Sequence, residues 1–225
     1  MFILKRWDIR LFGVSVALFA LWSQLDLITA GLFYSESGFQ LGRTLPFVII
    51  YDIFGYMPYL LVPGLLLLSL WALWRFREGT NPFRRKIFIF LLLSLVIGPG
   101  LVVNTLFKNN SIGRARPSQV VEFGGQNQFT PAWVYSGACK TNCSFVSGHA
   151  SMGFYFIALG WLLGSRRWFF IGLGIGSIVG LTRIVQGGHF LSDTVFAFWC
   201  VYWVNLALGR WLEIPSPFKT TQSPV

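Results

Sequence analysis

Residues 182–193 read Thr-Arg-Ile-Val-Gln-Gly-Gly-His-Phe-Leu-Ser-Asp and join two long apolar stretches in the last third of the chain. This short connection holds Arg183, His189 and Asp193, although charged residues make up only 12% of the sequence. Ionisable groups that persist between apolar segments usually have a function, because burying a charge in an apolar medium is costly. The stretch therefore predicts two membrane helices with a polar site where they meet.

The composition of the whole chain indicates an integral membrane protein. Hydrophobic residues make up 54% of the 225 residues, and the mean hydropathy is +0.61. Soluble domains rarely have this composition, and apolar runs of about 20 residues match the thickness of a bilayer. We expect an all-α membrane protein, with one domain over residues 1–225 and six transmembrane helices. The predicted spans are 11–32, 55–74, 87–107, 149–164, 168–186 and 192–211.

Segments outside these spans carry further expectations. Residues 34–54 contain Pro46 and are predicted to lie at the membrane interface rather than to form another span. Asp26 indicates that the outer end of the first span is exposed to water. That span is interpreted as a retained helix, because the small-residue pattern of a signal-peptide cleavage site is missing. Residues 215–225 are predicted to form a flexible tail.

The distribution of Lys and Arg predicts the orientation in the membrane. Basic residues concentrate on the cytoplasmic side of membrane proteins. One set of connections, with both termini, holds twelve of the eighteen: Lys5, Arg6, Arg10, Arg75, Arg77, Arg84, Arg85, Lys86, Arg166, Arg167, Arg210 and Lys219. The other set holds Arg43, Lys108, Arg114, Arg116, Lys140 and Arg183. Both termini are therefore predicted to be cytoplasmic. The net charge of +10 follows from this topology and an anion site, and nucleic acid is not expected as a partner.

The predicted outer face collects residues that bind phosphate. Lys108, Arg116 and Arg183 can hold phosphoryl oxygens, and arginine does so with planar, bidentate contacts. Ser147 and Gly148 precede the fourth span, where backbone N–H groups at a helix start favour an anion. We therefore expect these five residues to bind a phosphate group.

The chain contains two histidines, and both fall on the same predicted face. His189 precedes Asp193 by four residues, and a carboxylate on one ring nitrogen would leave the other nitrogen free to attack phosphorus. His149 would then serve as the acid that protonates the leaving alcohol and as the base that activates water. His189, His149 and Asp193 are the expected catalytic residues.

The segment 108–148 is the one long connection. Connections of this length in compact domains are usually functional or disordered. Its aromatic residues, among them Phe123, Phe129 and Trp133, are expected to pack on the membrane surface or over a site. Cys139 and Cys143 form a disulfide if the segment faces an oxidising compartment, and otherwise remain two thiols. No metal site is expected, since no further Cys or His lies nearby in sequence.

The three clusters resemble the motifs of the phosphatidic acid phosphatase type 2 (PAP2) superfamily of membrane lipid phosphatases. The family pattern K-x6-RP is similar to Lys108-(x7)-Arg116-Pro117, which is one residue longer. PSGH is similar to Val146-Ser147-Gly148-His149, and SR-x5-H-x3-D to Thr182-Arg183-(x5)-His189-(x3)-Asp193. The stretches 121–125 and 142–145 look like bacterial members that act on envelope lipids, including lipid A phosphatases.

The resemblance implies a six-helix core and a reaction without metal or cofactor. It implies that His189 is the nucleophile, with Asp193 as its partner and His149 as acid and base. The expected activity is hydrolysis of a phosphate from lipid A, undecaprenyl pyrophosphate or phosphatidylglycerophosphate, through a phosphohistidine, at the periplasmic face of a bacterial inner membrane.

Two alternatives remain open from the sequence. A lipid phosphotransferase would use the same intermediate with a lipid acceptor in place of water. An anion transporter would require ionisable residues or helix breaks near the middle of the membrane. The predicted spans are interrupted there only by Pro63 and the Gly98-Pro99-Gly100 run.

Overall fold

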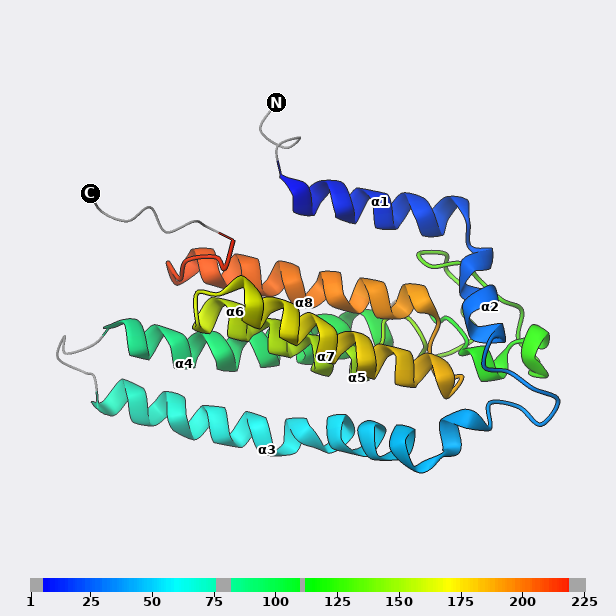
Figure 1. Ribbon diagram of the computed structural model, residues 1–225, viewed down its shortest axis with the longest axis horizontal. Helices are drawn as coiled ribbons and strands as arrows, with labels where there is room; N and C mark the ends of the chain where they lie inside the picture. Colours follow the sequence, from blue (N-terminus) through cyan, green and yellow to red (C-terminus); the bar gives the residue numbers. More distant parts are fainter. Residues whose placement is uncertain (1–5, 76–81, 110–111, 219–225) are drawn as a thin grey trace.

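A computed structural model describes residues 6–75, 82–109 and 112–218 of the chain (Figure 1). These residues form helices and connections, and no β-strand occurs among them. The first half contains α1 (Trp7–Leu21), α2 (Gln24–Gly31), the 3-10 turn η2 (Leu41–Arg43), α3 (Leu45–Arg75), α4 (Pro82–Leu95) and the π-helix η3 (Val96–Lys108). The second half contains the 3-10 turns η4 (Pro117–Gln119) and η5 (Val121–Phe123), then α5 (Gly148–Phe154), η6 (Tyr155–Ile157), α6 (Ala158–Leu162), α7 (Arg166–Val185) and α8 (Leu191–Trp211).

Four helices in the described part are long and apolar enough to cross a membrane: Leu45–Arg75, Phe83–Lys108, Arg166–Val185 and Leu191–Trp211. The helices α1 and α2 meet at 84° and make a fifth if the bent pair is one span. The predicted count of six is not confirmed. The expected fourth span is divided into α5, η6 and α6, whose 15 residues reach about 22 Å at helical rise, short of a ~30 Å hydrocarbon layer.

The helix α3 corrects the prediction for residues 34–54. Residues 45–54 are not a separate interfacial stretch but the first turns of a 31-residue helix. Pro46 is compatible with this start, because backbone N–H groups in the first turn have no helical partner to lose. Only 6% of the most apolar window of α3 is buried inside the protein, which is typical of a helix that faces lipid.

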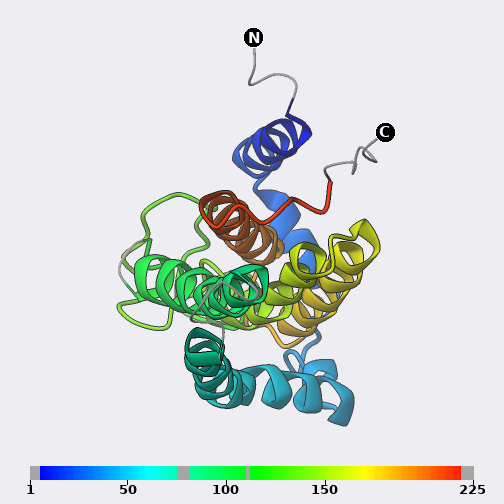
Figure 2. The same ribbon diagram turned by 90° about the vertical axis from the view of Figure 1, so that its left-hand side faces the viewer.

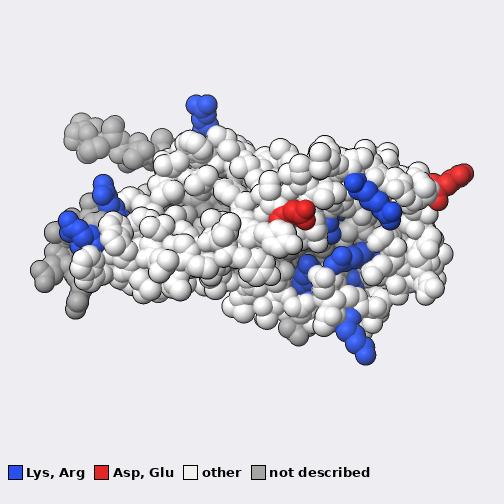
Figure 3. Space-filling model, turned by 90° about the horizontal axis from the view of Figure 1, so that it is seen from below, with Lys and Arg blue, Asp and Glu red and all other residues white. Residues whose placement is uncertain are grey.

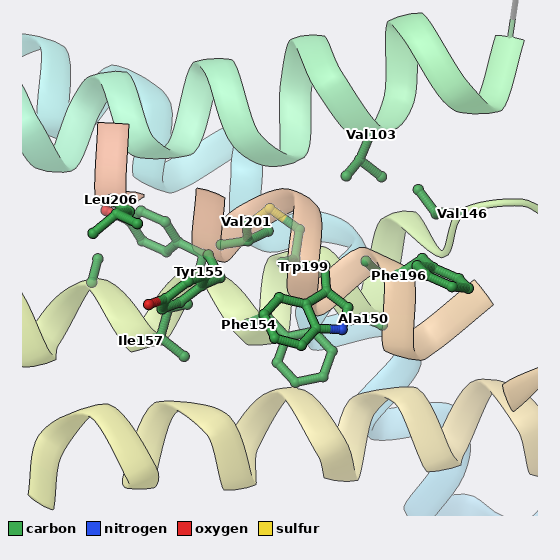
Figure 4. Packing of buried hydrophobic residues seen from close by; sticks show 14 of the residues in the cluster. Val103, Val146, Ala150, Phe154, Tyr155, Ile157, Phe196, Trp199, Val201 and Leu206 are labelled. Carbon is green, nitrogen blue, oxygen red and sulfur yellow. The ribbon is translucent and has the colours of Figure 1, made fainter. Parts of the chain in front are cut away.

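The core lies between α5, α7, α8 and η3, and Figure 4 shows its apolar side chains meeting between these helices. The short helix α5 packs against all three of the others, so it is the central element. Viewed along the helices, α1 and α3 lie on opposite sides of this core (Figure 2). Phe218 packs edge-on against Trp7 and Phe169, so the first part of the predicted tail, up to Phe218, is in contact with the helices. Residues 219–225 of that tail lie outside the described part.

The ends of the helices fall into two groups (Figure 1). The start of α1, the end of α3, the α6–α7 turn and the end of α8 lie at one end of the molecule. The helix α2, the turn η2, the 108–148 connection and the α7–α8 junction lie at the other. The sequence grouped the connections in the same way. Trp133 of the long connection packs against Phe145 and Phe196 at this second end.

Candidate functional site

The junction between α7 and α8 places Arg183 against His189. Two backbone amides, those of Gly188 and His189, donate to the carbonyl of Arg183 at 2.9 and 3.3 Å and close the turn. A Cβ on Gly188 would lie 2.3 Å from Nη2 of Arg183. The guanidinium therefore lies over the backbone of Gly188, and a side chain at this position would displace it.

His189 is fully buried, and its ring orientation follows from one contact. Its Nδ1 lies 2.7 Å from the carbonyl oxygen of Ser144 and 3.5 Å from Oδ2 of Asp193. A carbonyl oxygen can only accept, so Nδ1 carries the proton and donates it. Nε2 then holds the free lone pair, and it has no hydrogen-bond partner within the described protein. Burial lowers the pKa of His189 to about 3, although Asp193 opposes this shift, so the ring is neutral.

Asp193 is held by three donors besides the histidine. The backbone N–H of Phe190 donates to Oδ2 at 2.8 Å, and the hydroxyl of Ser144 donates to the same oxygen. Nη1 of Arg114 donates to Oδ1 at 2.7 Å. Ser144 thus contacts both His189, through its carbonyl, and Asp193, through its hydroxyl. The sequence placed Ser144 in a motif but assigned it no role.

Arg114 connects Asp193 to the N-terminal part of the chain. Its Nη2 donates to Oδ2 of Asp26 at 2.8 Å, and its Nε donates to the carbonyl of Thr130 at 2.8 Å. Ser192 also donates to Asp26, with its backbone N–H at 2.8 Å and its hydroxyl at 2.6 Å. The prediction that Asp26 is exposed to water was wrong. The exposed fraction of Asp26 is 0%. Its carboxylate can be buried because Arg114 pairs with it and Ser192 donates hydrogen bonds to it.

His149 faces α3. Its ring stacks on Tyr51 with centroids 4.3 Å apart and planes inclined by 13°. A Cβ on Gly55, one turn further along α3, would lie 3.1 Å from Nε2 of His149. This nitrogen, like Nε2 of His189, has no hydrogen-bond partner in the described protein. Because Tyr51 lies in the stretch expected at the interface, the sequence did not predict this wall of the site.

Lys108 reaches the start of α5 despite the extra residue in its motif. It is the last residue of the π-helix η3, and the extra residue lies beyond it, between Lys108 and Arg116. A Cβ on Gly148 would lie 3.3 Å from Nζ of Lys108 and 2.6 Å from Oδ1 of Asn104. Gly148 therefore leaves room for the ammonium group beside the backbone at His149.

The remaining predicted residues surround the same point. Ser147 caps α5 by accepting from the N–H of Ala150 at 3.3 Å, and its own N–H donates to the carbonyl of Asp193 at 3.1 Å. Arg183 lies 4.6 Å from the ring centre of Tyr51, and its Nε has no hydrogen-bond partner in the described protein. Arg116 donates to the carbonyl of Asn142 at 2.9 Å.

These side chains are close enough to interact through their charges. The charges of Arg183, Lys108 and Arg116 act on the ring of His149, and that of Arg183 also acts on His189. The structure thus brings together all eight residues that the sequence proposed for catalysis and phosphate binding. It adds Ser144, Arg114, Asp26 and Tyr51. Within the described residues, no group of three or more His, Cys, Asp or Glu side chains is arranged to hold a metal ion.

A disulfide between Cys139 and Cys143, with Cα atoms 5.6 Å apart, lies next to the site. The N–H of Cys139 donates to the carbonyl of Gly113 at 2.9 Å, and that of Cys143 to the carbonyl of Lys108 at 3.2 Å. Ser144, the next residue, donates its N–H to the carbonyl of Arg114 at 2.9 Å. Backbone hydrogen bonds from the disulfide-closed loop and from Ser144 therefore join this segment to the one that carries Lys108 and Arg114.

Comparison with known proteins gives the same family that the motifs indicated. The model of the PAP2 superfamily matches residues 87–212, which include every residue of the proposed catalytic group. A lipid A 4'-phosphatase of Francisella tularensis subsp. novicida (strain U112) is 39% identical over 205 residues, covering 84% of this chain and 88% of that protein.

Two other relatives match over a shorter part. A lipid A 4'-phosphatase of Rhizobium leguminosarum is 42% identical over 106 residues, or 45% of each chain. A lipid A 1-phosphatase of Rhizobium etli is 34% identical over 124 residues, covering 55% of this chain and 46% of that protein. No solved structure matches the chain significantly.

Proposed function

Because the chain belongs to the PAP2 superfamily, we propose that it removes a phosphate group from a lipid of the lipid A type through a phosphohistidine formed on His189. Relatives named lipid A 4'-phosphatase and lipid A 1-phosphatase make it a phosphomonoester hydrolase of membrane lipids. One observation carries the histidine mechanism. Nε2 of His189 is buried and unpartnered in the described protein, while its Nδ1 proton is fixed by Ser144.

In the first step, Nε2 of His189 attacks the phosphorus atom. A nitrogen–phosphorus bond forms, the bond from phosphorus to the ester oxygen breaks, and His149 gives its proton to the leaving oxygen. Negative charge on the phosphate favours the protonated form of the nearby His149 ring. Lys108, Arg116 and Arg183 stabilise the charge on the phosphoryl oxygens. The positive charge that develops on His189 is balanced by Asp193.

In the second step, water attacks the phosphohistidine. His149, now neutral, takes a proton from the water, the nitrogen–phosphorus bond breaks, and inorganic phosphate leaves. Both histidines return to their starting states. Each group in this cycle comes from the chain itself, so we propose that no metal ion takes part.

The orientation follows from the charges at the two ends of the molecule. Among the described residues, nine of the fifteen Lys and Arg belong to the end opposite the site, and such an excess marks the cytoplasmic side. We therefore place the site at the periplasmic face of a bacterial inner membrane and both termini in the cytoplasm.

The test is phosphate release from lipid A by the purified protein in detergent. Release is expected to continue with EDTA present, and His189→Gln is expected to lower kcat by about 10³-fold or more, because the nucleophile is lost. Arg84→Ala, which changes an exposed cation on α4 at the other end, serves as the control. Release that requires a divalent metal, or full activity of His189→Gln, would contradict the proposal.

A further inference from the structure

A cavity of about 790 Å³ lies beside the phosphate-binding residues. Its walls come from the α2–α3 connection, the first turns of α3, the η4–η5 segment and the end of α7. Figure 3 shows Lys and Arg side chains gathered in and around a hollow toward one end of the molecule. Arg183 and Tyr51 belong both to the cavity and to the site, so a ligand held by Arg183 would extend directly into this space.

The wall shared with the site is fixed by Gln186. This residue lies at the end of α7, accepts from Nη1 of Arg183, and donates to the carbonyls of Gly42 at 3.3 Å and Phe47 at 3.2 Å. A Cβ on Gly42 would lie 2.5 Å from Cα of Gln186, so the turn η2 rests directly on α7. The position of η2, and with it Arg43, is therefore coupled to that of Arg183.

The size and lining of the cavity indicate what occupies it. Inorganic phosphate is comparable to a few water molecules of ~30 Å³ each and would fill only a small part. The volume falls instead in the range of about 300–1,000 Å³ typical of pockets for whole small molecules. An acyl chain would favour an apolar lining, whereas most residues here carry polar atoms, including Glu36, Arg43 and Ser118.

Aromatic rings complete the lining. Tyr34, Phe39 and Phe123 form a cluster with centroids 5.2–5.6 Å apart, and all three line the cavity. Aromatic faces beside hydrogen-bonding groups suit a sugar ring, which presents apolar C–H faces and a rim of hydroxyls. A glycerol headgroup has no comparable ring face.

From this juxtaposition we propose that the cavity binds the sugar ring that carries the scissile phosphate, and that Arg43 determines specificity for it. The inference rests on the proposed function, since it assumes that the phosphate lies at Arg183. Arg43 ends η2, is exposed, and forms no ion pair with another described residue. The guanidinium of Arg43 donates to the oxygen substituents of the sugar, and the carboxylate of Glu36 accepts from the sugar hydroxyls.

Binding to the His189→Gln protein in detergent micelles tests this proposal without turnover. The two probes are lipid A, which has a sugar headgroup, and phosphatidic acid, which has none. Arg43→Ala is expected to weaken binding of lipid A about tenfold, as loss of a charged donor does, and to change binding of phosphatidic acid far less. Val48→Trp, which fills the cavity from α3, is expected to have the same selective effect.

Two matched variants control for fold and charge. Ile49→Trp adds the same ring one residue away, outside the cavity lining, and Arg84→Ala removes an exposed cation at the other end; neither is expected to alter the preference for lipid A. Equal weakening for both lipids, or no weakening by Arg43→Ala and Val48→Trp, would overturn the proposal. Phosphate release by the unaltered protein is measured separately, and its failure contradicts the reaction rather than the sugar site.

Discussion

Asp26 and Asp193 share the guanidinium of Arg114, at 2.8 and 2.7 Å, and all three side chains are fully buried. Asp193 in turn lies 3.5 Å from Nδ1 of His189. Arg114 and Asp26 touch no reacting atom in the proposed mechanism, so they are positioning residues that act through Asp193. With its charge divided between Arg114 and His189, Asp193 can orient the imidazole while the ring stays neutral before reaction.

We predict that Asp26→Asn lowers kcat about tenfold and leaves KM nearly unchanged, because Arg114 then loses one of its two carboxylates and shifts against Asp193. Asp8→Asn is the matched control. Asp8 is also buried and paired, with Arg6 and Tyr202, but it lies at the opposite end of the molecule. Both variants are expected to melt at lower temperature, and only Asp26→Asn should lose kcat. Equal kcat for the two would contradict the positioning role.

The residues of the site were predictable from sequence to different degrees. Both histidines, Asp193 and Arg183 stand out because ionisable groups are rare in an apolar chain. Asp26 was predicted to be exposed to water, since a carboxylate at a helix end is usually exposed. Its partner Arg114 is 88 residues away in the sequence. Such pairing depends on how the chain folds back and has no local pattern.

The segment that contains the disulfide positions part of the site. Cys139–Cys143 closes a short loop, and the backbone N–H groups of the two cysteines donate to the carbonyls of Gly113 and Lys108. Ser144 follows directly and contacts both His189 and Asp193. The loop therefore holds the carbonyl that sets the tautomer of His189, the proposed nucleophile.

We predict that the double variant Cys139→Ser/Cys143→Ser lowers the free energy of unfolding by about 2 kcal/mol, as expected for a short closed loop, and lowers kcat several-fold. Cys200→Ser, which changes the free cysteine on α8, is the control and should do neither. Thermal melting and phosphate release measure the two effects. Unchanged kcat in the double variant would show that Ser144 keeps its position without the disulfide.

The elements themselves were predicted unevenly. The spans around α7 and α8 were close to correct because long apolar runs are bounded by polar turns. The start of α3 was missed because Pro46 was interpreted as a sign of an interfacial stretch, whereas proline is tolerated in the first turn of a helix. The π-helix that ends at Lys108 was also not foreseen, because the apolar run 87–107 predicted only an ordinary helical span.

For the whole molecule, the arrangement of the two ends was the most predictable feature. Counting Lys and Arg in the connections grouped the same loops that lie together in Figure 1. The cavity beside Arg183 was not predictable, because its walls come from four segments spread between residues 34 and 186. The residues proposed for phosphate chemistry thus follow from local motifs, while the cavity proposed for the sugar depends on packing.

The most direct test of the central claim is to trap the intermediate. The protein is incubated with lipid A carrying a radioactive phosphate, quenched during turnover in alkali, and digested. The account predicts label on the peptide that contains His189, stable in alkali and lost in acid as expected of a phosphohistidine, and absent from His189→Gln. Turnover without labelled protein, or label that persists in His189→Gln, would contradict it.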